Sequence, residues 1–212
     1  MPLQKIQSLG KGQAWALWNI VESESELAYT AMESCPDEIQ SPLKRLEWLA
    51  ARALMRMMLE GIGLVYSGLQ KNEFGKPFLK GHSLHISLSH SYPHVLAQID
   101  KHQEVGVDLE QPKEKLRTIA HRVFSKEEVN DAADDIVKLC IYWCAKEALY
   151  KIYGKRNLLF TDHLRVMPFT LAQSGSLLGK IRLPENEMIN HLRYIVKDEF
   201  VMVFTDTQFV TI

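Results

Sequence analysis

The chain has little cysteine, no long apolar run and no excess of charge of either sign. Its three cysteines, Cys35, Cys140 and Cys144, form an odd and sparse set, which argues against the disulfide framework of a small secreted protein and favours a reducing, cytoplasmic compartment. The longest stretch without charged residues, Gly81–Ile99, contains four of the eight histidines and four serines, so it is too polar to be a membrane span.

The charges are almost balanced, with 25 Lys and Arg against 26 Asp and Glu and a formal net charge of −1. Such a chain does not bind nucleic acid by its overall charge, so any anionic ligand must be held by a local group of cations. The 212 residues are 46% hydrophobic and 24% charged, as in folded proteins, and give room for one domain or two small ones.

The hydrophobic periodicity alternates between that of helices and that of strands, which predicts an α+β fold. The first strong helix is Pro42–Leu59, and the longest is Ile136–Tyr153, which Gly154 would end. Lys101-His102-Gln103 is expected to join two strands as a hairpin. The other helices are expected at 116–123 and after a capping box at Ser125, and the strands near 84–88, 95–100, 104–110, 178–183, 191–197, 200–204 and 209–212.

Two acidic residues, Asp108 and Glu110, alternate with apolar residues in the expected strand 104–110. Residues i and i+2 of a strand point the same way and lie about 6.8 Å apart. Two such carboxylates repel each other unless water screens them or a cation lies between them. The pair is therefore either part of a solvent-facing strand edge or a pair of ligands for a hard divalent ion such as Mg²⁺, which prefers oxygen.

Another acidic residue, Glu147, precedes Lys151 by one helical turn in the segment WCAKEALYK. One interpretation is an ordinary surface ion pair, worth roughly a few tenths of a kcal/mol. The other is a phosphoryl-transfer site, in which the carboxylate binds a metal or accepts a proton and the lysine neutralises charge on non-bridging oxygens.

Cations and a histidine upstream are candidate anion contacts. Arg45, Arg52 and Arg56 lie roughly along one side of the helix 42–59, as either a solvated flank or an anion-binding edge. His90, between two serines, is a hydrogen-bonded loop residue, an anion contact or part of a Ser–His nucleophile. The last interpretation is disfavoured because GxSxG is absent and no residue is marked as an orienting acid.

Taken together, these motifs resemble those of a known family. Gly-Val-Asp-Leu-Glu, which contains Asp108 and Glu110, precedes Trp-x-x-Lys-Glu-Ala-x-x-Lys, which contains Glu147 and Lys151. Phe-Ser-Lys-Glu-Glu lies between the two motifs, and Gly-Lys-Pro and Ser-His-Ser lie upstream. From about residue 44 to residue 151, the chain closely resembles the 4′-phosphopantetheinyl transferases, specifically their Sfp-type branch.

The resemblance implies an enzyme that transfers the 4′-phosphopantetheine arm of coenzyme A to a serine of an apo acyl or peptidyl carrier protein, and that releases adenosine 3′,5′-bisphosphate. Asp108, Glu110 and Glu147 would bind Mg²⁺, Glu147 would also deprotonate the serine, and Lys151 would contact the pyrophosphate. The residues implied for substrate binding are Arg45, Arg52, Lys76, Pro77, Ser89, His90 and Lys146.

The family fold implies two similar α+β halves related by a pseudo-twofold, with the active site in the cleft between them. The expected division gives domains 1–101 and 102–212, of which the second carries the metal-binding motifs. The implied protein is a monomer with coenzyme A and an apo carrier protein as partners, and with neither nucleic acid nor membrane. The alternatives are a non-catalytic relative that binds coenzyme A or a carrier protein, and a Mg²⁺-dependent phosphohydrolase.

Overall fold

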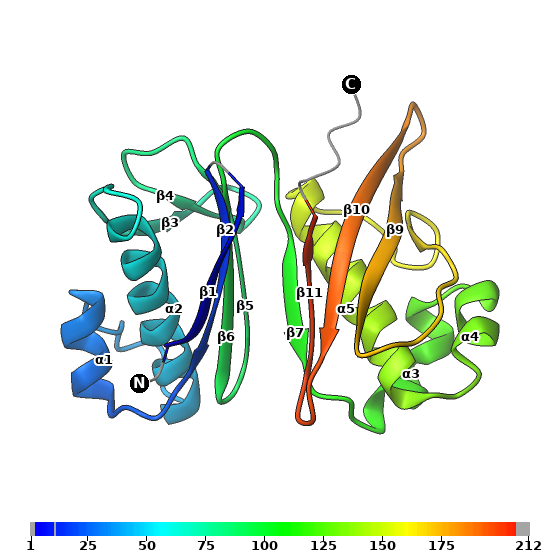
Figure 1. Cartoon of the computed structure of the whole chain (residues 1–212), viewed down its shortest axis with the longest axis horizontal. Helices are drawn as coiled ribbons and strands as arrows, with labels where there is room; N and C mark the ends of the chain where they lie inside the picture. The colour runs from blue at the N-terminus through cyan, green and yellow to red at the C-terminus, as the bar shows by residue number, and fades with distance from the viewer. Residues whose placement is uncertain (1–2, 11, 207–212) are drawn as a thin grey trace. The chain divides into compact units, whose positions relative to one another are not determined.

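The computed structural model describes residues 3–10 and 12–206, and the chain divides into two compact units, Met1–Gln103 and Glu104–Ile212 (Figure 1). Each unit has an antiparallel sheet, a long helix packed against it and a hydrophobic core of its own. The α+β class is therefore confirmed, whereas the pseudo-twofold and the cleft stay predictions. Over the part of the chain that is described, no helix has the length and apolarity needed to cross a membrane.

Unit 1 has a four-stranded sheet with the order β1-β2-β6-β5 and a separate ribbon of β3 and β4. The helix α2 packs against β6, β2 and β5, and α1 packs against α2 (Figure 1). The elements of unit 1 are β1 (Leu3–Gly10), β2 (Gln13–Asn19), α1 (Glu24–Ala31), α2 (Pro42–Glu60), β3 (Leu69–Lys71), β4 (Pro77–Leu79), β5 (His85–Ser91) and β6 (His94–Asp100).

The sequence of α2 explains its position. Pro42 occupies the first turn, where its missing N–H has no helical partner to lose, and Ser41 before it is extended. The buried face contains small residues such as Ala50 and Ala53, which let the helix approach the sheet closely, beside larger ones such as Leu54. The opposite flank of the helix is left for charged side chains.

Unit 2 has a five-stranded sheet with the order β7-β11-β10-β9-β8. The helix α5 contacts every strand of this sheet (Figure 1). Asp135 accepts hydrogen bonds from the first turn of α5, and Gly154, with φ 66°, ends it in the left-handed conformation. The elements of unit 2 are β7 (Val107–Glu110), α3 (Lys115–Val123), α4 (Lys126–Ala132), α5 (Ile136–Tyr153), β8 (Leu164–Val166), β9 (Ser174–Arg182), β10 (Glu187–Val196) and β11 (Val201–Thr205).

The expected hairpin around Lys101-His102-Gln103 is wrong, because the strands before and after it belong to different sheets. The strand β6 pairs with β2 and β5, while β7 pairs with β11, with Glu110 opposite Val201. The hydrophobic periodicity also does not predict β1, β2, α1, β3 or β8. The expected strand 209–212 lies outside the described residues.

Candidate functional site

The acidic strand and the long helix of unit 2 place charged groups side by side. Asp108 and Glu110 are on β7, and Glu147 and Lys151 are on α5, which packs against β7. Lys151 Nζ lies 2.8 Å from Asp108 Oδ1 and also donates a hydrogen bond of 2.8 Å to the carbonyl of Val107. The Asp108 side chain is only 9% exposed, so this ion pair is not an ordinary surface pair.

Gly106, immediately before β7, allows this close approach. A Cβ atom at Gly106 would lie 1.9 Å from the carbonyl oxygen of Ala148 on α5. The backbone is fixed on the other side by the Gly106 N–H, which donates to Thr205 Oγ1 at 2.8 Å. A glycine at this position therefore sets the distance between the strand that carries Asp108 and the helix that carries Glu147.

Glu147 lies in an electrostatic environment that favours its protonated form. Burial raises its pKa, the negative charges of Asp108 and Glu110 raise it further, and Lys151 opposes them, which leaves a value of about 7. A carboxylate with a pKa near neutrality can accept a proton from a substrate hydroxyl and release it again, which suits a general base.

The chemical fit of a divalent cation can be judged from the donors. Asp108, Glu110 and Glu147 offer the carboxylate oxygens that Mg²⁺ prefers. Besides burial, repulsion from the other two carboxylates raises the pKa of Glu147, and a bound cation would relieve that repulsion. Among residues 3–10 and 12–206, no three His, Cys, Asp or Glu side chains are already arranged to hold a metal ion. Therefore the donor types fit, and metal binding stays a prediction.

The neighbouring Lys146 points into the interior of unit 2. Its Nζ lies 2.7 Å from Glu128 Oε2 and donates to the carbonyls of Val123 and Phe160, and its side chain is 0% exposed. Burial lowers its pKa, while Glu128 opposes that effect. The structure thus does not bring Lys146 together with Lys151, and its contacts are those of a structural ion pair.

A small pocket of about 230 Å³ adjoins Glu110. It combines an aromatic wall, Trp143, with two cations, Lys113 and Lys115. Trp143 also stacks on Phe160, with 5.7 Å between the ring centroids, so it contributes to the packing of unit 2.

Unit 1 contains a larger pocket, of about 740 Å³, which we call the α2 pocket. Three of the residues expected to bind substrate line it: Arg52, Pro77 and His90. Lys76 and Ser89 are outside the lining of the α2 pocket, although both are next to residues that line it. The complete lining is Pro36, Ile39, Lys44, Trp48, Ala51, Arg52, Leu69, Gln70, Lys71, Gly75, Pro77, Leu88 and His90.

Arg52 is held firmly at the wall of the α2 pocket. Its Nε donates to Glu33 Oε2 at 3.0 Å, and its guanidinium lies 3.2 Å from the centroid of the Trp48 ring. Tyr66 in turn donates to Glu33 Oε1 at 2.5 Å. These contacts fix the guanidinium in one orientation and leave little conformational entropy to lose when an anion binds.

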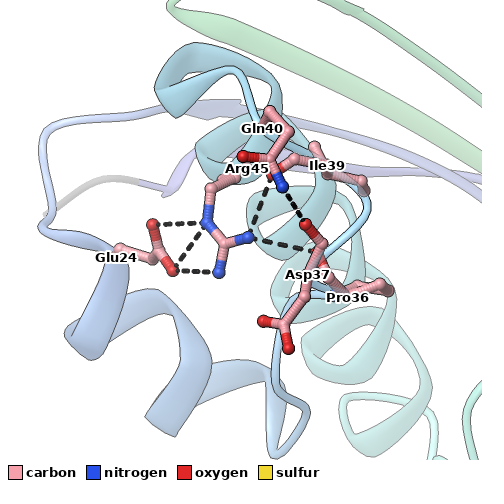
Figure 2. Close-up of polar contacts among 6 residues, drawn as sticks. All are labelled: Glu24, Pro36, Asp37, Ile39, Gln40 and Arg45. Carbon is pink, nitrogen blue, oxygen red and sulfur yellow. Dashed lines mark hydrogen bonds and ion pairs between the residues drawn. The ribbon is translucent and has the colours of Figure 1, made fainter.

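Arg45 lines a pocket other than the α2 pocket, and Figure 2 shows its polar contacts. Its guanidinium donates to both carboxylate oxygens of Glu24 and to the carbonyls of Pro36 and Ile39. It lines a different pocket, together with Cys35, so the structure does not bring it together with His90. Lys44, which the sequence analysis did not single out, lines the α2 pocket instead.

Unit 2 thus brings the acidic residues of β7 next to Glu147 and Lys151 of α5. Residues 104–201 match the family model of the 4′-phosphopantetheinyl transferase superfamily, and the match includes Asp108, Glu110, Glu147 and Lys151. It covers most of unit 2 and none of unit 1. No curated protein matches the chain. The resemblance is confirmed for this segment at the level of the superfamily, and the Sfp-type branch stays a prediction.

Proposed function

We propose that the protein is a 4′-phosphopantetheinyl transferase that moves the phosphopantetheine arm of coenzyme A to a serine hydroxyl of an apo carrier protein. The observation that supports this most strongly is the group on β7 and α5, because its four charged residues fall within the segment that matches the superfamily. The products would be the holo carrier protein and adenosine 3′,5′-bisphosphate.

In this proposal, Glu147 accepts the proton of the serine hydroxyl as its oxygen attacks the phosphorus atom next to the phosphopantetheine arm. Lys151, held by Asp108, neutralises charge on the pyrophosphate oxygens. Asp108, Glu110 and Glu147 would hold Mg²⁺, which when bound lowers the repulsion between the hydroxyl and the phosphate and stabilises the leaving group.

The α2 pocket would bind the nucleotide end of coenzyme A. Among the described residues that line it, Lys44, Arg52, Lys71 and His90 are basic and none is Asp or Glu. This excess of positive charge suits the 3′-phosphate, while the ring of Trp48 and the apolar lining suit the adenosine. A chain with almost no net charge can bind a polyanion by such local sorting of its charges.

The proposal is tested by incubating the protein with coenzyme A, Mg²⁺ and a panel of apo carrier proteins of fatty-acid, polyketide and nonribosomal-peptide type. Mass spectrometry of each carrier should show the added phosphopantetheine on at least one of them. Glu147→Gln should lower the transfer rate by at least about 100-fold, because the base is lost, and should leave coenzyme A binding intact.

Three results would contradict the proposal. Folded protein that modifies no carrier but binds coenzyme A without metal would favour a binding relative. Release of free phosphopantetheine without a carrier would favour a hydrolase. Unchanged turnover of Glu147→Gln would remove Glu147 from its proposed role.

A further inference from the structure

Glu47 is a buried acidic residue of α2 that contacts residues lining the α2 pocket. Its side chain is 4% exposed, which is unusual for a glutamate unless it is paired. It does not line the pocket itself, but two of its partners do. These are Lys44, one turn earlier on α2, and His90, on β5.

The carboxylate of Glu47 contacts three groups, one on α2, one on β5 and one in the turn after β5. Its Oε2 lies 2.6 Å from Lys44 Nζ and 3.2 Å from His90 Nδ1, and its Oε1 accepts a hydrogen bond of 3.0 Å from the Tyr92 N–H. Burial raises the pKa of Glu47, but the contacts with His90 and Lys44 outweigh burial and lower it to about 2. Glu47 is therefore ionised at neutral pH and holds its partners by charge.

These contacts fix which atoms face the pocket. Because Nδ1 of His90 is occupied by Glu47, Nε2 is the ring nitrogen that can contact a ligand. The side chains of Lys44 and His90 remain 59% and 42% exposed, so both can reach an anion while Glu47 holds them from behind. This is the arrangement by which a buried carboxylate orients the groups that bind a ligand.

We infer that Glu47 is a positioning residue that holds Lys44 and His90 in place to bind a phosphomonoester in the α2 pocket, which in the proposed function is the 3′-phosphate of coenzyme A. The inference rests on that proposed function for the identity of the phosphate. The expected effect of Glu47 on anion binding is opposite in sign to that of an isolated negative charge. If Glu47 acted only as a negative charge, its removal would strengthen the binding of an anion, whereas loss of a positioning residue weakens it.

The test compares two nucleotides on the full chain by isothermal titration calorimetry, adenosine 3′,5′-bisphosphate and adenosine 5′-monophosphate. The wild type should bind the bisphosphate more tightly. Glu47→Gln should weaken bisphosphate binding by about tenfold, the scale of loss when an orienting partner is removed, with little change for the monophosphate. Glu47→Asp keeps the charge but shortens the side chain, so it should also weaken bisphosphate binding.

Two further variants separate positioning from general damage. Glu60→Gln is the matched control, because Glu60 is on α2, pairs with Arg56 at 2.7 Å and lies outside the α2 pocket, so both affinities should stay at the wild-type level. In a His90→Ala background, Glu47→Gln should cost less bisphosphate affinity than in the wild type, because one of its two positioned groups is already absent. Thermal unfolding of each variant reports whether it is folded, and Glu47→Asp is the test variant if the glutamine variant is not.

The possible outcomes are distinct. Folded Glu47 variants that bind the bisphosphate as tightly as the wild type, or more tightly, overturn the inference and leave the proposed function intact, with transfer by the wild type as the check. Equal losses for both nucleotides also overturn it, because positioning predicts a loss specific to the additional phosphate. A wild type that does not prefer the bisphosphate overturns both the inference and the proposed nucleotide site.

Discussion

Glu147 has a pKa that its surroundings in unit 2 raise to near neutrality. Its pKa is raised from 4.5 to about 7 by burial and by two carboxylates, which means that folding favours the protonated form. As pH rises from 5 to 8, the folded protein has to accept a buried negative charge that the unfolded chain carries in water. The contribution of Glu147 to stability is therefore favourable at low pH and is lost as pH passes through 7.

We therefore expect Glu147→Gln to become more stable relative to the wild type as pH rises. In EDTA, the difference in free energy of unfolding should shift by about 2 kcal/mol in favour of the variant between pH 5 and pH 8. Urea unfolding at the two pH values measures this shift. A variant that loses stability relative to the wild type over the same range would contradict the prediction.

The second prediction at this scale concerns the buried pair of Glu128 and Lys146. Glu128 is 2% exposed, and besides Lys146 it accepts hydrogen bonds from the N–H groups of Ser125 and Val166. Lys146→Met would leave the negative charge of Glu128 buried and unpaired. We therefore expect the free energy of unfolding, measured by chemical denaturation, to fall by about 3–5 kcal/mol. The matched control is Lys180→Met, which removes an exposed ion pair with Glu187 and should cost far less stability. Equal effects of the two variants would contradict the structural role of Lys146.

At the scale of residues, the sequence could predict the chemistry better than the contacts. Asp108, Glu147 and Lys151 were identified because their motifs are local and their spacing is specific. Lys44 and Arg45 are consecutive on α2, and consecutive helical residues point about 100° apart, so the sequence alone did not tell which one faces the pocket. Two of the three partners of Glu47, His90 and Tyr92, come from β5 and the turn after it, which only the tertiary structure brings to α2.

At the scale of elements, the contact between β7 and α5 depends on the absence of a side chain at Gly106. Gly106→Ala would place a methyl group against the backbone of Ala148, which cannot move as a flexible side chain can. We expect a loss of about 2–3 kcal/mol in unfolding free energy and a large fall in the transfer rate, because Asp108 and Glu147 would move apart.

The control for this substitution is Gly61→Ala. Gly61 ends α2 with φ −62°, a conformation that alanine adopts without strain, so the cost should be less than about 1 kcal/mol. The two variants are compared by urea unfolding and by mass-spectrometric transfer assays. The prediction is wrong if Gly106→Ala retains both wild-type stability and wild-type transfer.

The helices of the protein could be predicted more accurately than its strands. Local signals mark the ends of α2 and α5, namely Pro42 in the first turn of α2 and Gly154 after α5. In the structure, both helices begin and end within one residue of the predicted positions. Strand pairing depends on distant partners. Adjacent strand-like runs therefore predicted a hairpin at 101–103, whereas the partner of β7 is a strand almost a hundred residues later.

At the scale of the whole molecule, the division into two units has a testable consequence. The α2 pocket is lined only by residues of unit 1, and each unit has its own core. We therefore expect residues 1–103, expressed alone, to fold and to bind adenosine 3′,5′-bisphosphate. Residues 104–212 alone should show helical circular dichroism but should not bind it measurably.

Calorimetry on each segment, with circular dichroism to establish folding, measures this difference. A folded segment 1–103 that does not bind the bisphosphate would show that the α2 pocket is insufficient as the nucleotide site. Such a result would not contradict the catalytic roles proposed for the charged residues on β7 and α5.

The pairing of β7 with β11 determines when unit 2 can complete its sheet during synthesis. The last strand of the unit 1 sheet ends at Asp100, so that sheet can close while unit 2 is still being translated. β7 emerges early in unit 2, but its partner Val201–Thr205 emerges almost last. The backbone edge of β7 therefore lacks its partner strand through most of the translation of unit 2, a period in which binding by a chaperone would protect it.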